Sequence, residues 1–173
     1  MFFAAIGVFL YLQKTEPPWY ARLWYPLRYT SIVRGHADHY RLDPALLAAV
    51  IEAESKFNAD ARSGAGAVGL MQLTPTTAKG IAQYTGGHNF RVSDLTNPEI
   101  NVRYGSWYLR HLLDRYHQKE RVALAAYNAG EDNVDRWQRE HVGIRFDETR
   151  DYVDKVERLK KLYRRVYASQ LGY

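Results

Sequence analysis

A start signal for an α-helix, repeated three times, constrains the fold of this chain more than any other feature. A polar residue that can cap a helix stands directly before a proline at Asp43-Pro44, Thr74-Pro75 and Asn97-Pro98. The capping side chain satisfies free backbone N–H groups, and proline is tolerated at the first helical position because no donor is needed there. Apolar residues then recur at helical spacing. We therefore predict helices from Pro44 to about Lys56 and from Pro98 to about Tyr116.

The same helical periodicity continues through most of the remaining chain. A shorter helix is predicted from about Glu120 to the turn signature Asn128-Ala129-Gly130, and a last helix from about Arg150 to Ala168. No run of alternating β-branched residues is long enough for a strand. We expect a mostly α fold with irregular loops at 57–73 and 86–96, and at most a very small β-hairpin in the first loop.

The N-terminal segment differs from the rest of the chain, because residues 1–12 carry no charge. As a helix they would be about 18 Å long, roughly half of a bilayer core. We interpret them as the end of a signal-anchor; the alternative is an apolar helix packed on the domain. Residues 13–25 contain Pro17-Pro18 and several Trp and Tyr residues, which favours an extended linker at a membrane interface. The predicted division is an apolar segment and linker over 1–24 and one globular domain over 25–173.

Composition excludes several kinds of chemistry and leaves the partner open. The chain has no cysteine, which excludes disulfides, thiolate metal ligands and a thiol nucleophile. Its histidines do not follow the HExxH spacing, so no metal is expected. The formal charge of +5 favours nucleic acid, a membrane or an acidic wall polymer. No recognition helix or stacking sheet is predicted, so nucleic acid is not expected. The basic stretch from Lys155 to Arg165 is interpreted as the solvated face of an amphipathic helix.

One glutamate in the first predicted helix is a candidate for acid–base chemistry. At 100° per residue, Leu47, Val50 and Ile51 share one face with Glu54, whereas Glu52 points the opposite way and is predicted to be solvated. A carboxyl on an apolar face resists ionisation and can serve as a general acid near neutral pH. The alternative is that Glu54 simply ends the helix at the surface.

A glycine-rich segment at 64–69 formally matches the dinucleotide-binding pattern GxGxxG. That motif requires a preceding strand and a βαβ unit, and the predicted elements around this segment are helices and a polar loop. We interpret the segment as a flexible loop close to a ligand.

Several short blocks, taken in their order along the chain, closely resemble the catalytic domain of soluble lytic transglycosylases, a lysozyme-like family that cleaves peptidoglycan. The resemblance covers about residues 25–163. The blocks that carry it are Tyr25-Pro26-Leu27, Glu54-Ser55, Ser63, Gly69-Leu70-Met71-Gln72, Tyr108, Ala126-Tyr127-Asn128-Ala129-Gly130 and Glu148-Thr149-Arg150-Asp151-Tyr152.

The resemblance implies a lysozyme-like α domain with a single acid/base residue and a set of substrate-binding side chains. Two positions depart from the family pattern: Thr74 stands where relatives often carry methionine, and Glu131-Asp132 replaces a frequent Pro-Gly, which leaves the following loop undefined. The resemblance implies that Glu54 is the catalytic residue and that Ser63 and Gln72 donate or accept hydrogen bonds with the substrate. It implies that Tyr108, Tyr127 and Asn128 bind the sugar at the cleavage site. Glu148 and Tyr152 are implied to lie at the edge of the cleft or to support it.

The reaction implied by the resemblance is cleavage of the β-1,4 bond between N-acetylmuramic acid and N-acetylglucosamine, with formation of 1,6-anhydromuramic acid. It needs no cofactor and no metal. We expect a monomer that acts on peptidoglycan glycan strands in the extracytoplasmic cell envelope. We also expect residues 1–12 to anchor it to the membrane. Two alternatives stay open: a hydrolytic lysozyme of the goose type and a non-catalytic wall-binding module.

Overall fold

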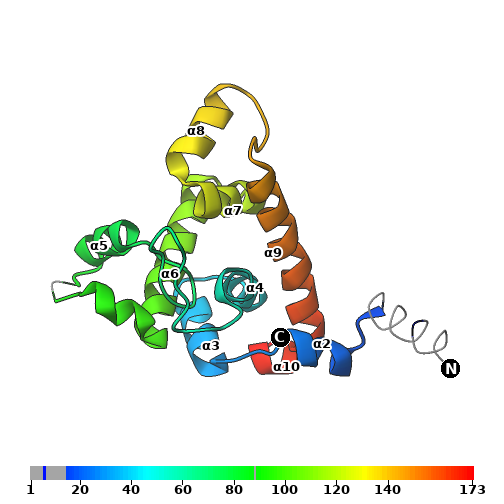
Figure 1. Ribbon diagram of the computed structural model, residues 1–173. Coiled ribbons are helices and arrows are strands. Elements are labelled where there is room, and N and C mark those ends of the chain that lie inside the picture. Colours follow the sequence, from blue (N-terminus) through cyan, green and yellow to red (C-terminus); the bar gives the residue numbers. More distant parts are fainter. Residues whose placement is uncertain (1–5, 7–14, 88) are drawn as a thin grey trace.

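The computed structural model describes residue 6, residues 15–87 and residues 89–173, and in these residues the chain is almost entirely helical (Figure 1). The predicted helix at 1–12 lies, apart from residue 6, outside the described residues. The helices are α2 (Pro18–Trp24), α3 (Thr30–His39), α4 (Pro44–Ser55), α5 (Pro75–Tyr84), α6 (Pro98–Arg115), α7 (Glu120–Ala129), α8 (Glu131–Arg139), α9 (Asp147–Val166) and α10 (Ala168–Leu171), with a 3-10 helix η1 (Val92–Thr96) before α6.

β-pairing in the described residues is limited to two isolated antiparallel bridges in the loop between α4 and α5. Val68 pairs with Arg62 on one side and with Leu73 on the other. The expected fold class, mostly α with at most a very small hairpin in this loop, is confirmed.

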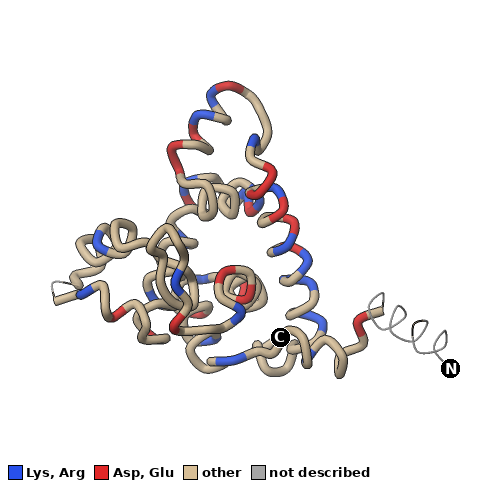
Figure 2. The backbone as a smooth tube through the Cα atoms, in the orientation of Figure 1, with Lys and Arg blue, Asp and Glu red and all other residues tan. Residues whose placement is uncertain are grey.

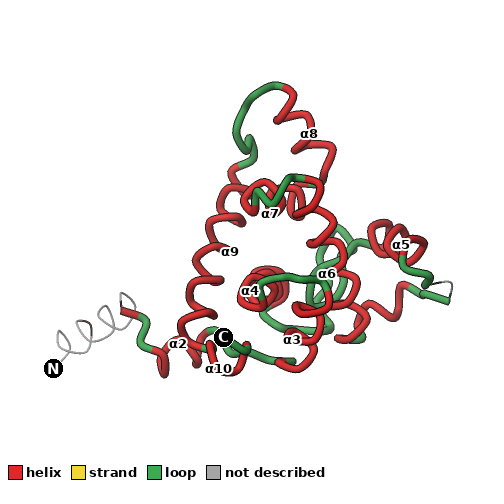
Figure 3. Tube along the Cα trace, turned by 180° about the vertical axis from the view of Figure 1, so that it is seen from behind, coloured by secondary structure: helices red, strands yellow, loops and turns green. Residues whose placement is uncertain are grey.

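Helix α4 runs through the centre of the molecule. Figure 1 shows it end-on, with α9 on one side, α6 on the other and α3 below, and Figure 3 shows the same arrangement from behind. Asp43 caps it through hydrogen bonds from the Ala45 and Leu46 N–H groups, at 2.9 and 3.4 Å. Every residue from 45 to 52 is buried, and α4 packs along α9 and against α3. The helix therefore holds its last turn at a fixed place beside α9.

Two parts of the chain differ from the sequence-based expectation. Residues 18–24, expected to be extended, form α2, because proline at the first helical position favours a helix start and Tyr20 and Ala21 are buried in the contact of α2 with α9. The undefined loop after Gly130 is the helix α8, whose buried residues are Val134 and Trp137. Neither α3 nor α8 has a side-chain cap at its start, so the sequence contains no local start signal for them.

The basic stretch on α9 is more than a solvated face. Acidic and basic residues are mixed in the first part of this helix, and its charged residues after Glu157 are all basic (Figure 2). Lys160 lies 2.7 Å from Glu120 and 3.4 Å from Asp43, and Arg164 lies 3.0 Å from Asp43. These cations join α9 to the first residue before α4 and to the start of α7.

Candidate active site

Glu54 lies in the last turn of α4, half-buried, with its carboxyl largely removed from water. Burial disfavours the charged form and raises the pKa of Glu54 to about 7, against an opposing effect of the Tyr152 hydroxyl and the Lys155 ammonium. Lys155 is fixed nearby, since its Nζ donates to the carbonyl of Ala53 at 2.9 Å. A carboxyl with a pKa near 7 can both donate and accept a proton at neutral pH.

Two tyrosines from other helices lie beside this carboxyl. Burial and the charge of Glu54 raise the pKa of Tyr127 on α7 and of Tyr152 on α9 well above the usual value for tyrosine, so both remain protonated. The Tyr127 hydroxyl donates to the carbonyl of Met71 at 2.8 Å. The Tyr152 hydroxyl is buried and makes no hydrogen bond of normal geometry within the described chain, although its proximity lowers the pKa of Glu54. It is therefore a donor held next to the carboxyl.

Asn128 follows Tyr127 and is exposed beside the start of α9. Its Oδ1 accepts a hydrogen bond from the Thr149 hydroxyl at 2.7 Å, which orients the amide and leaves its nitrogen available as a donor. Thr149 is buried and was not among the predicted site residues, although it lies inside one of the blocks that carry the family resemblance. Glu148, one residue earlier, is exposed in the first turn of α9.

Ser63 and Gln72 hold the loop at 57–73 in shape. The Ser63 hydroxyl accepts from the N–H of Ala67 at 3.0 Å. The Gln72 amide nitrogen donates to the carbonyls of Gly69 and Ala61, at 2.9 and 3.2 Å. The Ser63 hydroxyl hydrogen and the Gln72 side-chain amide oxygen are left to form hydrogen bonds with a substrate.

A buried asparagine that sequence reasoning missed attaches the same loop to α6. Asn101 accepts from the N–H of Met71 at 2.8 Å and donates to the carbonyls of Val68 and Leu95, at 2.9 and 2.8 Å. It therefore fixes Met71, the residue whose carbonyl accepts the hydrogen bond from the Tyr127 hydroxyl. The available signal was a polar residue at a position of α6 where the periodicity requires a buried side chain.

Tyr108 extends the site away from Glu54. Its ring packs against Tyr127 with a centroid separation of 5.5 Å, and its hydroxyl donates to Glu131 at 3.4 Å. Thr74, the departure from the family pattern, caps α5 by accepting from the N–H of Thr77 at 3.1 Å. The structure thus joins Glu54, Tyr127, Tyr152 and Tyr108 through direct neighbours, whereas no contact between Glu54 and either Ser63 or Glu148 is found in the described residues.

The prediction that Glu52 is solvated is wrong. Its side chain is 4% exposed and accepts a hydrogen bond from the Tyr163 hydroxyl at 3.3 Å. Burial raises the pKa of Glu52 as well. The reason is that α9 covers the face of α4 that a one-sided helix would leave to water. The nearly continuous apolar run from 45 to 51 was the sequence signal for a helix buried all round.

A desolvated carboxyl with a pKa near neutral, such as that of Glu54, is common in enzymes that perform general acid–base chemistry. The family model described as Transglycosylase SLT domain matches residues 31–147. The chain belongs to this family, and the resemblance inferred from the sequence is confirmed.

Individual relatives agree with this assignment. The chain is 30% identical to the soluble lytic murein transglycosylase of Salmonella typhimurium over 151 residues, which are 81% of this chain and 23% of the relative. It is 38% identical to the transglycosylase of Enterobacteria phage PRD1 over 104 residues, 60% of this chain and 36% of the relative. The X-ray structure of an inactive mutant of the lytic transglycosylase Slt from Pseudomonas aeruginosa superposes with a TM-score of 0.80 at 31% identity, covering 86% of this chain and 26% of that chain.

The chain spans about a quarter of the length of the soluble lytic murein transglycosylases that it matches.

Proposed function

We propose that this chain cleaves the β-1,4 bond between N-acetylmuramic acid and N-acetylglucosamine in peptidoglycan and closes a 1,6-anhydro ring on the muramic acid. The family and the names of its relatives support the substrate. The observation that carries the proposal is the Glu54 carboxyl with a pKa of about 7. Within the described chain, the groups that shift its pKa are Tyr152 and Lys155, and neither is a second carboxylate.

A single carboxyl can serve both halves of the reaction. Protonated Glu54 donates to the glycosidic oxygen, the bond to C1 breaks, and the N-acetyl carbonyl of the same sugar stabilises the positive charge at C1. Glu54, now a carboxylate, then takes the proton of the C6 hydroxyl while the C6 oxygen bonds to C1. The attacking hydroxyl belongs to the substrate and has a high effective concentration, so no activated water is needed.

The remaining predicted residues bind and orient the sugar. Tyr127 and Tyr152 stay protonated beside Glu54 and can donate to the substrate or to the carboxylate. Asn128, oriented by Thr149, is suited to the acetamido group. Ser63, Gln72, Tyr108 and Glu148 are proposed to contact the glycan further from C1.

The product distinguishes this reaction from hydrolysis on the same fold. Purified peptidoglycan is digested, new reducing ends are assayed, and the soluble muropeptides are analysed by mass spectrometry. Anhydro products, about 18 mass units lighter than hydrolytic ones because water is not added, and no new reducing ends are expected. Reducing ends that rise in step with soluble muropeptides would replace the proposal with a goose-type lysozyme activity. No release of muropeptides at all would favour a wall-binding module.

We also propose that residues 1–24 hold the domain formed by residues 25–173 at a membrane outside the cytoplasm. The large apolar side chains of Trp19, Leu23 and Trp24 on α2 are 59, 71 and 61% exposed. Trp at such positions suits the boundary between headgroups and acyl chains. Among the described helices, none has the length and apolar character needed to cross a bilayer.

A further inference from the structure

Three aromatic rings from two helices form a row beside Tyr108, and no role has been given to them above. We define the aromatic row as Tyr84, Trp107 and His111. The rings of Tyr84 and Trp107 are 5.9 Å apart and 13° from parallel, and those of Trp107 and His111 are 5.4 Å apart and 3° from parallel. Tyr84, at the end of α5, is 81% exposed. Trp107 is half-buried between them. Parallel rings at a surface, with one of them strongly exposed, are typical of places that bind a flat partner.

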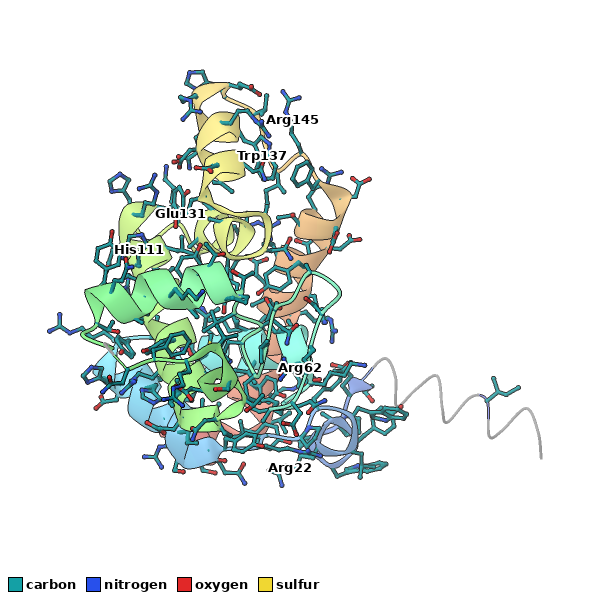
Figure 4. All side chains as sticks on the ribbon, turned by 60° about the vertical axis from the view of Figure 1, so that its left-hand side comes forward. Arg22, Arg62, His111, Glu131, Trp137 and Arg145 are labelled. Atoms are coloured by element: carbon teal, nitrogen blue, oxygen red, sulfur yellow. The ribbon has the colours of Figure 1, made fainter. Side chains whose placement is uncertain are left out.

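The row lines a cavity of about 510 Å³ between α5, α6 and the start of α8. The lining also contains the hydroxyls of Thr76 and Thr77 on α5, the second of which is hydrogen-bonded to the Thr74 hydroxyl at 2.9 Å, and the carboxylate of Glu131. Figure 4 shows His111 and Glu131 close together, and the His111 Nε2 lies 3.7 Å from the Glu131 Oε2. Ring faces combined with a few hydroxyl and carboxylate groups fit a ligand with one apolar face and a rim of hydroxyls, as a pyranose has.

Tyr108 connects this cavity with the candidate active site. The Tyr108 ring lines the cavity and also packs on Tyr127, the tyrosine next to Glu54. The Tyr108 hydroxyl donates to Glu131, which Arg115 also holds through a 3.2 Å ion pair. Tyr108 is therefore the residue that the two places share, and a polymer that occupies both of them passes it.

We propose that the aromatic row is a remote saccharide-binding subsite, at which a sugar of the bound glycan strand stacks on Trp107 and Tyr84. The inference rests on the proposed function, because it takes the glycan strand as the occupant. In this inference, rings that lie away from the reacting bond contribute part of the affinity for long strands. Binding energy from such a distant contact is available only to substrates long enough to reach it.

The first experiment measures kcat/KM of the full chain for long uncross-linked glycan strands and for a tetrasaccharide muropeptide. For Tyr84→Ala and Trp107→Ala, the ratio of the long-strand value to the tetrasaccharide value is expected to fall about tenfold, the size of effect that losing one well-stacked ring produces. Trp107→Phe keeps a ring and is expected to restore most of the ratio. Tyr29→Ala removes another exposed tyrosine, at the start of α3, and is expected to keep the wild-type ratio.

Tyr84→Ala is the decisive variant for folding reasons, because a side chain that is 81% exposed contributes little to the core. A wild-type ratio in both Tyr84→Ala and Trp107→Ala overturns the inference. An equal fall in Tyr29→Ala overturns it as well.

The second experiment separates the subsite from the reaction by measuring binding without turnover. Chitohexaose is titrated by calorimetry into the Glu54→Gln protein with and without Tyr84→Ala. The Kd is expected to rise about tenfold when the ring is removed, and an unchanged Kd overturns the subsite. A protein that makes no anhydro product but shows this rise in Kd refutes the proposed reaction and keeps a saccharide site at the row.

Discussion

Two glutamates at the end of α4 lie in different surroundings although they are two residues apart. Glu52 points into the contact with α9 and receives the Tyr163 hydroxyl, whereas Glu54 faces Tyr127 and Tyr152. Both have a raised pKa because both are withdrawn from water. Only Glu54 has an unsatisfied tyrosine hydroxyl beside it, so we assign the chemistry to Glu54 and a structural role to Glu52.

Glu54→Gln is expected to reduce turnover on peptidoglycan by at least about 10²- to 10⁴-fold, since the amide can neither donate nor retrieve the proton. The measurement is release of soluble muropeptides by protein whose folding is verified by circular dichroism. Glu52→Gln is the matched control and is expected to stay near wild-type turnover, because an amide can also accept from Tyr163. Retained activity in Glu54→Gln, or its loss in folded Glu52→Gln, would show that the wrong carboxyl has been assigned.

Glu54→Gln is also expected to change how the stability of the protein depends on pH. Folding raises the pKa of Glu54 from 4.5 to about 7, so between these values the folded state keeps a proton that the unfolded chain releases. The free energy of unfolding of the wild type therefore falls as pH rises through this window, by up to about 3 kcal/mol, and this contribution is constant above it. Glu54→Gln lacks the fall and is expected to become more stable than the wild type with rising pH. Denaturant unfolding of both proteins across this window measures it, and a constant difference between them contradicts the prediction.

The loop at 57–73 is the element that connects α4 with the tyrosines of the site. Its glycines differ sharply in what they allow. Gly69 has φ +84°, and a Cβ there would overlap the Asn101 side chain and the Leu95 carbonyl, whereas a Cβ at Gly64 would meet open space. A glycine is therefore required at position 69 so that the loop can pack closely on α6, in addition to any role of the segment near a ligand.

Gly69→Ala is expected to destabilise the protein by about 2 kcal/mol or more, through backbone strain and the displacement of Asn101. Activity is expected to fall with it, because Asn101 binds the N–H of Met71, whose carbonyl accepts the hydrogen bond from the Tyr127 hydroxyl. Gly64→Ala in the same loop is the control. Thermal unfolding and muropeptide release measure both variants, and an effect of equal size in the two would refute the packing explanation.

Two surfaces that carry large apolar side chains lie in separate places on the molecule. The aromatic row lies between α5 and α6, whereas Trp19, Leu23 and Trp24 lie on α2, which packs against α9. These two surfaces suit different partners, a glycan strand for the first and a bilayer boundary for the second. An enzyme held at a membrane by residues 1–24, as proposed above, can in this way keep its site free for the polymer.

Removal of residues 1–14 is expected to move the protein from the membrane fraction to the soluble fraction, while α2 and its contact with α9 are retained. Western blots of fractionated cells that express the full chain or the shortened chain give the measurement. Equal solubility of the two forms would instead support an N-terminal segment packed on the domain.

Three helix starts and the main acidic residue of the candidate site follow from local relations in the sequence. The starts at Pro44, Pro75 and Pro98 were predictable because a cap and a proline act within one turn. The apolar surroundings of Glu54 followed from its position relative to Leu47 and Ile51 on one helix face, which is again a local relation.

The packing of one helix on another determines what covers each helix face and which side chains from distant parts of the sequence come into contact. The apolar run from 45 to 51 indicates a helix buried all round, but it does not indicate that the covering helix is α9, which begins about one hundred residues after Glu52. Tyr152 reaches Glu54, and Tyr84 meets Trp107, through the packing of separate helices. Helical periodicity places each of these residues on a face of its own helix, but the neighbouring helix that completes the contact is determined by long-range packing.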